Sequence, residues 1–393
     1  MRNDLHHQSL PILTAASLAL MFTRSKIGLH VASQYAAIVH MQEDAHIAEV
    51  LKEDCHIFGV FDGHGGPEVA KFCSKRMPTE LQQQPAFQQG RYEASLTQVF
   101  HRMDELMRSR EGFNELEALR KEVEGKDGDG GEEEEDTYDM LRKLVDPASG
   151  QQAPESTLQP EATVQAGCTA VVALLMGDRL YVANAGDSRA VLCRGGKALA
   201  MSEDHKPAAP DERARIMAAG GFLSEIGGIT RVNGNLNLSR AIGDLRYKMN
   251  ADLEPKDQII SAEPDVTSQQ LTAEDTFLVL ACDGIWDVMT SQQVVDFVRP
   301  RLEKGCPPHE VASELLNACL ANDPKEARGI GCDNMTAAIV VFAPNQPLMG
   351  GGSCSHGAIL EEHGSKGEVA APEASSALQP QHAAGAAAAA AKA

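Results

Sequence analysis

Five short apolar runs recur along the chain, each bounded by turn-forming or charged residues. They are HIFGVFD (56–62), TAVVALL (169–175), RLYVANAGDSRAVL (179–192), DTFLVLACD (275–283) and NMTAAIVVF (334–342). Their length and their content of Val, Leu, Ile and Phe predict buried β-strands. In the third run, the Gly-Asp pair at 186–187 predicts a turn that joins two strands.

Five other segments place apolar residues at helical spacing. The predicted helices cover residues 67–81, 95–123, 211–221, 291–305 and 309–320, and the third and fourth end on Gly, a common helix stop. The predicted strands lie close enough in sequence to pair as hairpins, and the helices do not alternate strictly with them. This order favours an α+β layered sandwich over a doubly wound sheet.

The charge of the chain is acidic and unevenly distributed. Of the 393 residues, 56 are Asp or Glu and 35 are Lys or Arg, which gives a formal net charge of −21. Residues 111–139 hold thirteen acids and three bases, so −10 of the total lies in this segment. A nucleic-acid-binding protein needs a basic surface for its phosphate contacts, so the balance argues against that class. It suits a protein that meets basic partners or holds divalent cations.

Composition also divides the chain into parts. We expect an N-terminal extension at 1–35, a globular domain at 36–345, and a disordered low-complexity tail at 346–393. Within the domain, residues 124–160 form an acidic insert rich in Gly and Pro that we expect to be disordered. The apolar stretch at 10–22 has 13 residues, too few to span a bilayer. We interpret it as part of the extension rather than as a signal peptide or organellar presequence.

The nine cysteines are scattered and include no CxxC pair. Such a set predicts reduced thiols in the cytoplasm or nucleus and argues against a structural zinc site. Cys168, Cys282 and Cys332 lie near the motifs described next, but none lies in a phosphate-loop signature. We interpret all three as buried packing residues.

Carboxylates lie at or near the ends of the predicted strands. The set is Glu43, Asp44, Asp62, Asp187, Asp283, Asp287 and Asp333. Any one of them alone fits a turn former or a helix cap. A buried carboxylate is costly unless it is paired or bound to a cation, however, and this set is accompanied by no His or Cys cluster. Such a set favours a hard cation such as Mg²⁺ or Mn²⁺.

Seven motifs follow one another in an order found in a single family. They are HMQEDAH, FDGHGG, NAGDSRAVL, SEDHKP, LNLSRAIGD, ACDGIWDVM and GCDNMT. From about residue 40 to residue 343, the chain resembles the metal-dependent Ser/Thr protein phosphatases of the 2C type. The sequence LNLSRAIGD, the Tyr-Lys pair after it and the acidic insert most resemble the gamma-type members. The resemblance implies two packed antiparallel β-sheets flanked by helices, with metal ions in a cleft at one end.

The resemblance also implies which residues hold two Mg²⁺ or Mn²⁺ ions. Asp62 would bridge both ions. Asp283 and Asp333 would complete the first site, and Glu43 and the backbone carbonyl of Gly63 would hold the second.

Further acidic residues receive lesser roles from the same resemblance. Asp187 and Asp287, together with Asp283, match a weaker third cation site. Asp44 and Asp244 would lie one step farther from the ions and orient metal-bound waters.

The implied reaction is the hydrolysis of phosphoserine and phosphothreonine in proteins. A hydroxide that bridges the two ions would attack phosphorus without a phospho-enzyme intermediate. The departing alkoxide needs a proton, and His64, two residues after Asp62, is the matching general acid. On its own, a histidine in a glycine-rich turn is equally consistent with a surface or capping residue.

The chain departs from the family pattern upstream of the first acidic motif. The family has Gly-Trp-Arg there, and its arginine grips the substrate phosphate. This chain has SQYAAIVHMQED, with Ile38 or Val39 at that place. Loss of such a charge-assisted contact, worth about 1.5–3 kcal/mol, predicts activity weakened roughly tenfold to a hundredfold. Arg24 or Lys26 would replace it only if the N-terminal segment folds back.

Two other functions remain open at this point. The first is a catalytically weak or silent phosphatase-like protein that binds phosphoproteins, which the missing arginine supports. The second is a dinuclear hydrolase of nucleotides or diesters, which the lack of basic residues near the motifs disfavours. For the phosphatase we expect phosphorylated proteins as partners, among them basic ones that the acidic insert attracts. We also expect no nucleic acid, no membrane span, a monomer, and a location in the cytoplasm or nucleus.

Overall fold

The computed structural model describes residues 32–39, 44–124, 164–321 and 331–343 of the chain. The N-terminal extension up to residue 31, most of the acidic insert and the tail after residue 343 therefore lie outside the described residues. The first described strand begins at Ala32, four residues before the domain boundary that we predict at 36. No helix in the described part combines the length and apolar character that a bilayer span requires.

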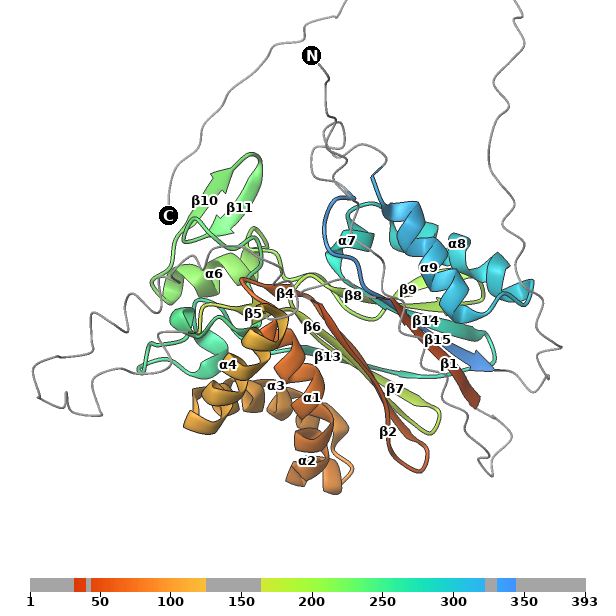
Figure 1. Cartoon of the computed structure of the whole chain (residues 1–393), viewed down its shortest axis with the longest axis horizontal. Helices are drawn as coiled ribbons and strands as arrows, with labels where there is room; N and C mark the ends of the chain where they lie inside the picture. The colour runs from red at the N-terminus through yellow and green to blue at the C-terminus, as the bar shows by residue number, and fades with distance from the viewer. Residues whose placement is uncertain (1–31, 40–43, 125–163, 322–330, 344–393) are drawn as a thin grey trace, which may run out of the picture. The chain divides into compact units, whose positions relative to one another are not determined.

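Two five-stranded antiparallel sheets form the centre of the fold (Figure 1). The first has the order β13-β7-β6-β3-β2 and consists of β13 (Asp265–Gln270), β7 (Arg179–Ala185), β6 (Ala170–Met176), β3 (Cys55–Phe61) and β2 (Ala45–Lys52). The second has the order β1-β15-β14-β8-β9 and consists of β1 (Ala32–Val39), β15 (Ala337–Ala343), β14 (Asp275–Ala281), β8 (Arg189–Arg194) and β9 (Lys197–Ala200).

The central strands are apolar on both faces because each sheet is covered on both sides. In β3, Ile57 and Phe61 pack toward helices, whereas Phe58 and Val60 pack between the two sheets. Strand β14 repeats this alternation between an outer helical layer and the layer between the sheets. Double burial explains why these strands appear in the sequence as continuous apolar runs rather than as alternating ones.

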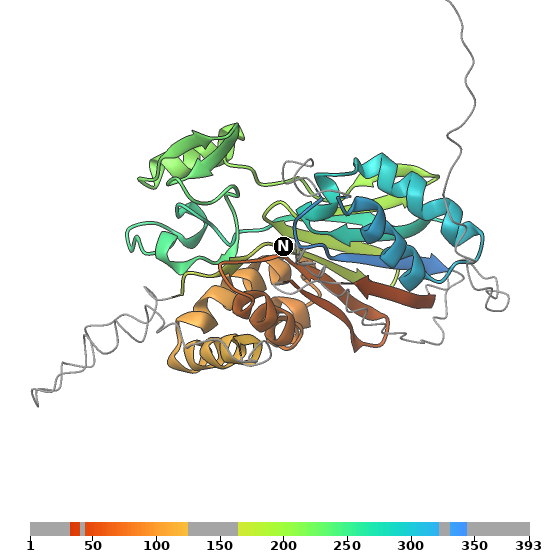
Figure 2. The same cartoon turned by 45° about the horizontal axis from the view of Figure 1, so that its top comes forward.

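Helices cover the outer faces of the two sheets (Figure 2). On the first sheet lie α1 (Glu68–Gln83), α2 (Pro85–Gln88), α3 (Tyr92–Arg108) and α4 (Arg110–Glu124). On the second lie α8 (Ser291–Glu303) and α9 (Pro308–Cys319). The predicted α+β sandwich of two antiparallel sheets flanked by helices is confirmed.

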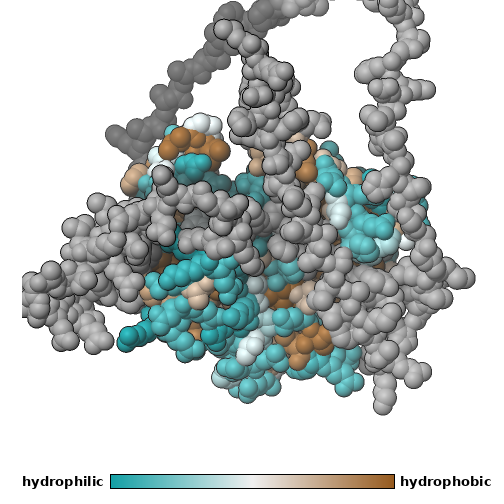
Figure 3. Space-filling view, in the orientation of Figure 1, coloured by the Kyte–Doolittle hydropathy of each residue, from teal (hydrophilic) through white to brown (hydrophobic). Residues whose placement is uncertain are grey.

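Smaller elements gather around the ends of the strands. They are the three-stranded sheet of β12 (Ile242–Gly243), β5 (Gly167–Cys168) and β4 (Gly63–His64), the hairpin β10 (Leu223–Ile226) and β11 (Ile229–Val232), the helices α6 (Pro210–Ala218) and α7 (Asp283–Trp286), and the 3₁₀ turns η2 (Leu245–Tyr247) and η3 (Pro255–Asp257). Exposed apolar side chains belong to this region, among them Phe222, Ile226 and Ile229. Figure 3 shows hydrophobic surface over the β10–β11 hairpin.

Two predictions about local structure are wrong. The helical pattern at 95–123 breaks at Ser109, which has extended backbone angles and whose Oγ accepts a hydrogen bond from the Gly112 N–H at 3.0 Å. The strands β7 and β8 do not pair as a hairpin, since they belong to different sheets. Gly186, with φ of 120° and Thr169 against it, lets the chain cross from one sheet to the other.

The three cysteines near the motifs agree only in part with the sequence interpretation. Cys168 and Cys282 are fully buried, as expected of packing residues. Cys332 is exposed, so its interpretation as a buried residue is wrong. It lies in the loop before β15 rather than within a strand, which explains why an apolar neighbourhood in the sequence does not bury it.

A buried ion pair joins α3 to the loop after β12. Lys248 Nζ donates to Asp104 Oδ2 at 2.6 Å and to the Ala241 carbonyl at 2.7 Å. Asp104 Oδ1 accepts from the Gly243 N–H at 2.8 Å, so the carboxylate holds both a side chain and the backbone. Both side chains are almost completely buried.

Lys248→Met is expected to lower the free energy of unfolding by about 3–5 kcal/mol, because it leaves the Asp104 carboxylate buried without its cation. Urea denaturation followed by circular dichroism measures this loss. The control is Arg299→Ala, which breaks the exposed Arg299–Glu303 pair and should cause no measurable change. Equal losses in the free energy of unfolding for the two substitutions would show that the buried Asp104–Lys248 pair matters no more to stability than an exposed pair does.

Candidate active site

Asp62 directly follows β3, which lies between β6 and the edge strand β2 in the first sheet. Its carbonyl accepts a hydrogen bond from the Thr169 N–H at 2.9 Å, which continues the pairing of β3 with β6 for one more residue. Because β2 and β6 flank β3 and run antiparallel to it, the residues that precede these two strands lie beside Asp62. The end of the buried strand therefore delivers a carboxylate to the edge of the core.

Other carboxylates act strongly on Asp62. Burial raises the pKa of Asp62 well above its usual range, and the charges of Asp44, Asp283, Asp187 and Asp333 raise it further. The sequence-predicted acidic residues are therefore close enough to repel one another. A group of like charges that are partly removed from water is an arrangement that a cation would stabilise.

The short helix α7 presents two of these carboxylates directly after β14. Asp283 is its first residue and Asp287 follows its last one, with the Asp287 N–H donating to the Asp283 carbonyl at 2.8 Å. Burial, followed by the charge of Asp187, raises the pKa of Asp283 to about 7. Burial likewise raises the pKa of Asp287. The four-residue spacing thus places both groups on the same side of one helical turn.

Asp187 faces these two residues from the crossing between β7 and β8. It is 2% exposed, and its Oδ2 accepts a hydrogen bond from Lys206 Nζ at 2.5 Å. Burial alone would lower the pKa of Lys206, but the charges of Asp187, Asp283 and Asp287 outweigh burial and raise it. Lys206 is a residue of the candidate site that the carboxylate pattern missed, although it lies in the quoted motif SEDHKP.

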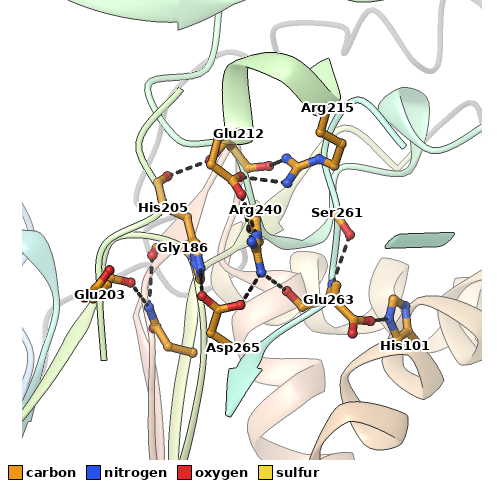
Figure 4. A network of polar contacts seen from close by, with 12 residues as sticks. His101, Gly186, Glu203, His205, Glu212, Arg215, Arg240, Ser261, Glu263 and Asp265 are labelled. Carbon is orange, nitrogen blue, oxygen red and sulfur yellow. Dashed lines mark hydrogen bonds and ion pairs between the residues drawn. The ribbon is translucent and has the colours of Figure 1, made fainter. Parts of the chain in front are cut away.

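A network of polar contacts, some buried and some exposed, holds the loop that carries Lys206 (Figure 4). His205 Nδ1 accepts from the Gly186 N–H at 3.2 Å, and its Nε2 lies 3.1 Å from Asp265 Oδ2. Arg240 Nη1 donates to the other oxygen of Asp265 at 2.8 Å, and its Nε and Nη2 donate to Glu212. The hydrogen bond with His205, with help from Arg240, holds the pKa of Asp265 well below its usual range. The network fixes the turn at 186–187 and therefore the position of Asp187.

Asp44 directly precedes β2 of the first sheet, and Asp333 lies in the loop before β15 of the second sheet. Thr336 Oγ1 donates to Asp44 Oδ2 at 2.6 Å, and Asp44 Oδ1 is buried and accepts no hydrogen bond from the described residues. Burial raises the pKa of Asp44 to about 6, although the hydrogen bond from Thr336 opposes the change. Asp333 is exposed, and its Oδ1 accepts from the Asn334 N–H at 2.8 Å.

His64 and Asp244 form a close pair at the small sheet. His64 Nε2 lies 2.6 Å from Asp244 Oδ2, with the histidine side chain 25% exposed and the aspartate side chain 0% exposed. Strand β5 lies between β4 and β12, so His64 and Gly243 both oppose Gly167 and flank it from either side. Strand pairing thus brings together two residues that are 180 positions apart.

Part of the predicted site cannot be placed. Glu43 lies outside the described residues, as do Arg24 and Lys26. Ile38 and Val39, at the place of the expected arginine, pair with Ala338 and Ala337 at the start of β15. The backbone there thus runs beside the strand that follows Asp333, and the side chains of β1 are not described.

The types of donor atom at the site suit divalent cations, although the described side chains do not form a complete set of ligands. Among the described residues, no three His, Cys, Asp or Glu side chains converge on one point. The donor set nevertheless consists of carboxylates that repel one another, and the buried Oδ1 of Asp44 lacks a partner within the described part. Hard oxygen donors of this kind suit Mg²⁺ or Mn²⁺.

Comparisons with known proteins identify the family that this chain resembles. The family model for protein phosphatase 2C matches residues 30–129 and 131–327. Probable protein phosphatase 2C 11 of Oryza sativa subsp. japonica is 42% identical over 313 residues, which cover 76% of this chain and 81% of the relative. Probable protein phosphatase 2C 5 of Paramecium tetraurelia is 42% identical over 316 residues, which cover 79% of this chain and 92% of the relative.

Solved structures show the same fold at lower sequence identity. A phosphatase from a pathogenic strain of Toxoplasma gondii superimposes with a TM-score of 0.54 at 23% identity, covering 78% of this chain and 93% of that one. A sex-determining protein of C. elegans gives a TM-score of 0.55 at 20% identity, covering 82% and 67%. With the family match over most of the chain and relatives of this identity, the chain belongs to the protein phosphatase 2C family and is a protein phosphatase.

Proposed function

We propose that the chain hydrolyses phosphoserine and phosphothreonine in proteins by a mechanism that depends on two divalent cations. The observation that supports this most is the group of carboxylates around Asp62, which raise one another's pKa at one end of the stacked sheets. His64, two residues from Asp62, supplies a proton donor beside the same site. Family membership makes phosphate monoesters in proteins the matching substrate class.

Asp62, Asp283, Asp333 and the Gly63 carbonyl would hold the two ions, with Glu43 as a further ligand from outside the described residues. Asp187 and Asp287, with Asp283, would hold a weaker third ion. Two bound cations supply Lewis-acid chemistry, because they lower the pKa of a shared water and neutralise charge on the phosphoryl oxygens.

The chain's own residues contribute positioning and a proton. Asp44 keeps one carboxylate oxygen beside Asp62 while Thr336 holds the other, so it is placed to orient water in the site. His64 donates a proton to the departing serine or threonine oxygen, whose alkoxide is a poor leaving group. Partial exposure of the imidazole leaves it accessible to a bound substrate.

The finer identity of the enzyme is also part of the proposal. The sequence LNLSRAIGD, the Tyr247-Lys248 pair and the acidic insert support a gamma-type member. The same insert, whose residues 124–160 hold eleven acids and three bases, supports basic phosphoproteins as substrates. The seven free cysteines of the described residues support a location in the cytoplasm or nucleus, and we propose a monomer.

The full-length protein is expected to release phosphate from a phosphothreonine peptide when Mn²⁺ or Mg²⁺ is present and to stop when a chelator is added. A phosphodiester substrate, assayed in parallel, should not be cleaved. Release that is unaffected by the chelator would contradict the metal-dependent mechanism. If the chain binds phosphopeptide but releases no phosphate, the catalytically silent phosphoprotein-binding module replaces the enzyme as the better description.

A further inference from the structure

We propose that Asp244 is a positioning residue that holds His64 by its Nε2 and so makes Nδ1 the nitrogen that delivers the proton. This inference rests on the proposed function, in which His64 is the general acid. It changes the role of Asp244 that the sequence suggests, because the carboxylate meets an imidazole instead of lying toward water at the cations. The 2.6 Å separation between Nε2 and Oδ2 is the starting observation.

The Asp244 carboxylate is buried, and its contact with His64 offsets the free-energy cost of that burial. Its side chain is 0% exposed, and its second oxygen, Oδ1, accepts no hydrogen bond from the described residues. A buried carboxylate without a cationic or hydrogen-bonding partner is costly. The contact with His64 therefore gives this carboxylate a hydrogen-bonding partner.

The backbone of Asp244 is held in an unusual conformation that directs the side chain to His64. Its φ of 49° and ψ of 37° are left-handed, which is uncommon for a residue other than Gly and costs about 1 kcal/mol or more. The Asp244 N–H donates to the Ala166 carbonyl at 2.9 Å, and Asp104 fixes the preceding residue through the Gly243 N–H. The buried Asp104–Lys248 pair thus helps to hold the strained turn through the hydrogen bond between Asp104 and the Gly243 N–H.

Gly167 provides the space in which the two side chains meet. A Cβ atom at this position would lie about 2.4 Å from Asp244 Oδ2 and 2.7 Å from His64 Nε2. Any larger residue would push the carboxylate and the imidazole apart. No positive φ is required of Gly167, so the requirement for glycine at this point is the close approach of the pair.

The arrangement determines which atom performs the proposed proton transfer. A carboxylate oxygen accepts hydrogen bonds and does not donate them, so Nε2 carries the hydrogen that lies between the two groups. When the serine or threonine oxygen leaves phosphorus, it takes the proton from Nδ1, and the neutral imidazole keeps its Nε2–H toward Asp244. The leaving P–O bond breaks as the new O–H bond forms, and no other reactant is needed.

Asp244→Asn tests this role through the leaving group. A phosphothreonine peptide needs a proton on its departing alkoxide, whereas p-nitrophenyl phosphate leaves as a stable phenolate. We expect kcat/KM for the peptide to fall roughly 100-fold and that for p-nitrophenyl phosphate to fall less than about threefold. Because Asp244 acts through His64, His64→Gln and the double substitution should reduce peptide turnover to about the same level. Equal losses on both substrates, or additive losses in the double variant, would overturn the assignment.

A measurement on the unaltered protein keeps the proposal testable if Asp244→Asn does not fold. Nitrogen NMR of ¹⁵N-histidine-labelled protein should show His64 with its hydrogen on Nε2 whenever the ring is neutral. Hydrogen on Nδ1 in the neutral ring would contradict the proposal. Failure of the unaltered protein to hydrolyse either substrate would instead contradict the proposed function, and the NMR result distinguishes the two failures.

Discussion

Asp62→Asn is expected to lower kcat/KM for a phosphothreonine peptide by about 10³-fold or more, while leaving the metal-free protein at least as stable as before. The amide has the shape of the acid but cannot carry its charge, so the proposed bridge between two cations is lost. In the metal-free protein the same charge is a burden, because burial and the neighbouring carboxylates Asp44 and Asp283 already disfavour it. Activity and stability should therefore change in opposite directions.

Steady-state assays, Mn²⁺ titration by calorimetry and thermal unfolding in chelator together measure these effects. The matched control is Asp275→Asn, which removes another buried carboxylate, bound by Arg194 Nε at 2.7 Å and lying away from the site in the second sheet. That variant should lose stability and keep both its turnover and its Mn²⁺ affinity. An Asp62→Asn protein that binds Mn²⁺ normally would remove Asp62 from the metal ligands.

The sequence was sufficient for the core of the fold and for the identity of most carboxylates near Asp62. Strands such as β3 and β14 are apolar on both faces, so burial leaves a strong signal in a short run of residues. Asp62 and Asp283 are visible because each ends such a run abruptly. The signal for these strands and carboxylates is the succession of apolar and polar residues, which can be seen within a few consecutive positions.

Contacts between distant segments carry no comparable signal. The pairing of His64 with Asp244 depends on the two-residue strand β5 lying between them, and such short strands have no periodicity to detect. The crossing at Gly186 resembles a hairpin in the sequence because a turn looks the same whether the next strand joins the same sheet or the other one. The contact between Lys206 and Asp187 likewise depends on the path of the chain from one sheet to the other.

The metal-free protein is expected to lose stability as the pH rises from about 5 to about 8, the reverse of ordinary acid denaturation. Asp44 and Asp283 have folded-state pKa values raised from 3.8 to about 6 and about 7. A carboxylate that binds its proton more tightly in the folded state stabilises that state below its unfolded pKa, and this contribution is lost as the pH passes the folded value. Since each tenfold change in proton affinity is worth about 1.4 kcal/mol, we expect a loss of a few kcal/mol.

Other titrating groups do not hide this loss of stability. They titrate in a different pH range, or the direction of their contribution is known. Asp265 and Asp275 have lowered pKa values, so their contributions disappear only as the pH falls below the usual carboxylate range. Burial lowers the pKa of His56, which therefore acts in the opposite direction below about pH 6.5. Urea denaturation of Asp283→Asn beside the unaltered protein isolates the site, since the variant should show a smaller loss and the same His56 contribution.

Addition of Mg²⁺ or Mn²⁺ should reverse the trend, because a cation favours the deprotonated carboxylates that the metal-free protein disfavours. The unaltered protein with cation should therefore be more stable at about pH 8 than at about pH 5, and Asp283→Asn should lose most of this gain. If the metal-free protein were already most stable at about pH 8, the carboxylates around Asp62 would be relieved by contacts within the chain itself. Lys206 is the cation placed to provide that relief, since it already lies against Asp187. Such a result would require the proposed third cation to compete with its ammonium group for the same oxygens.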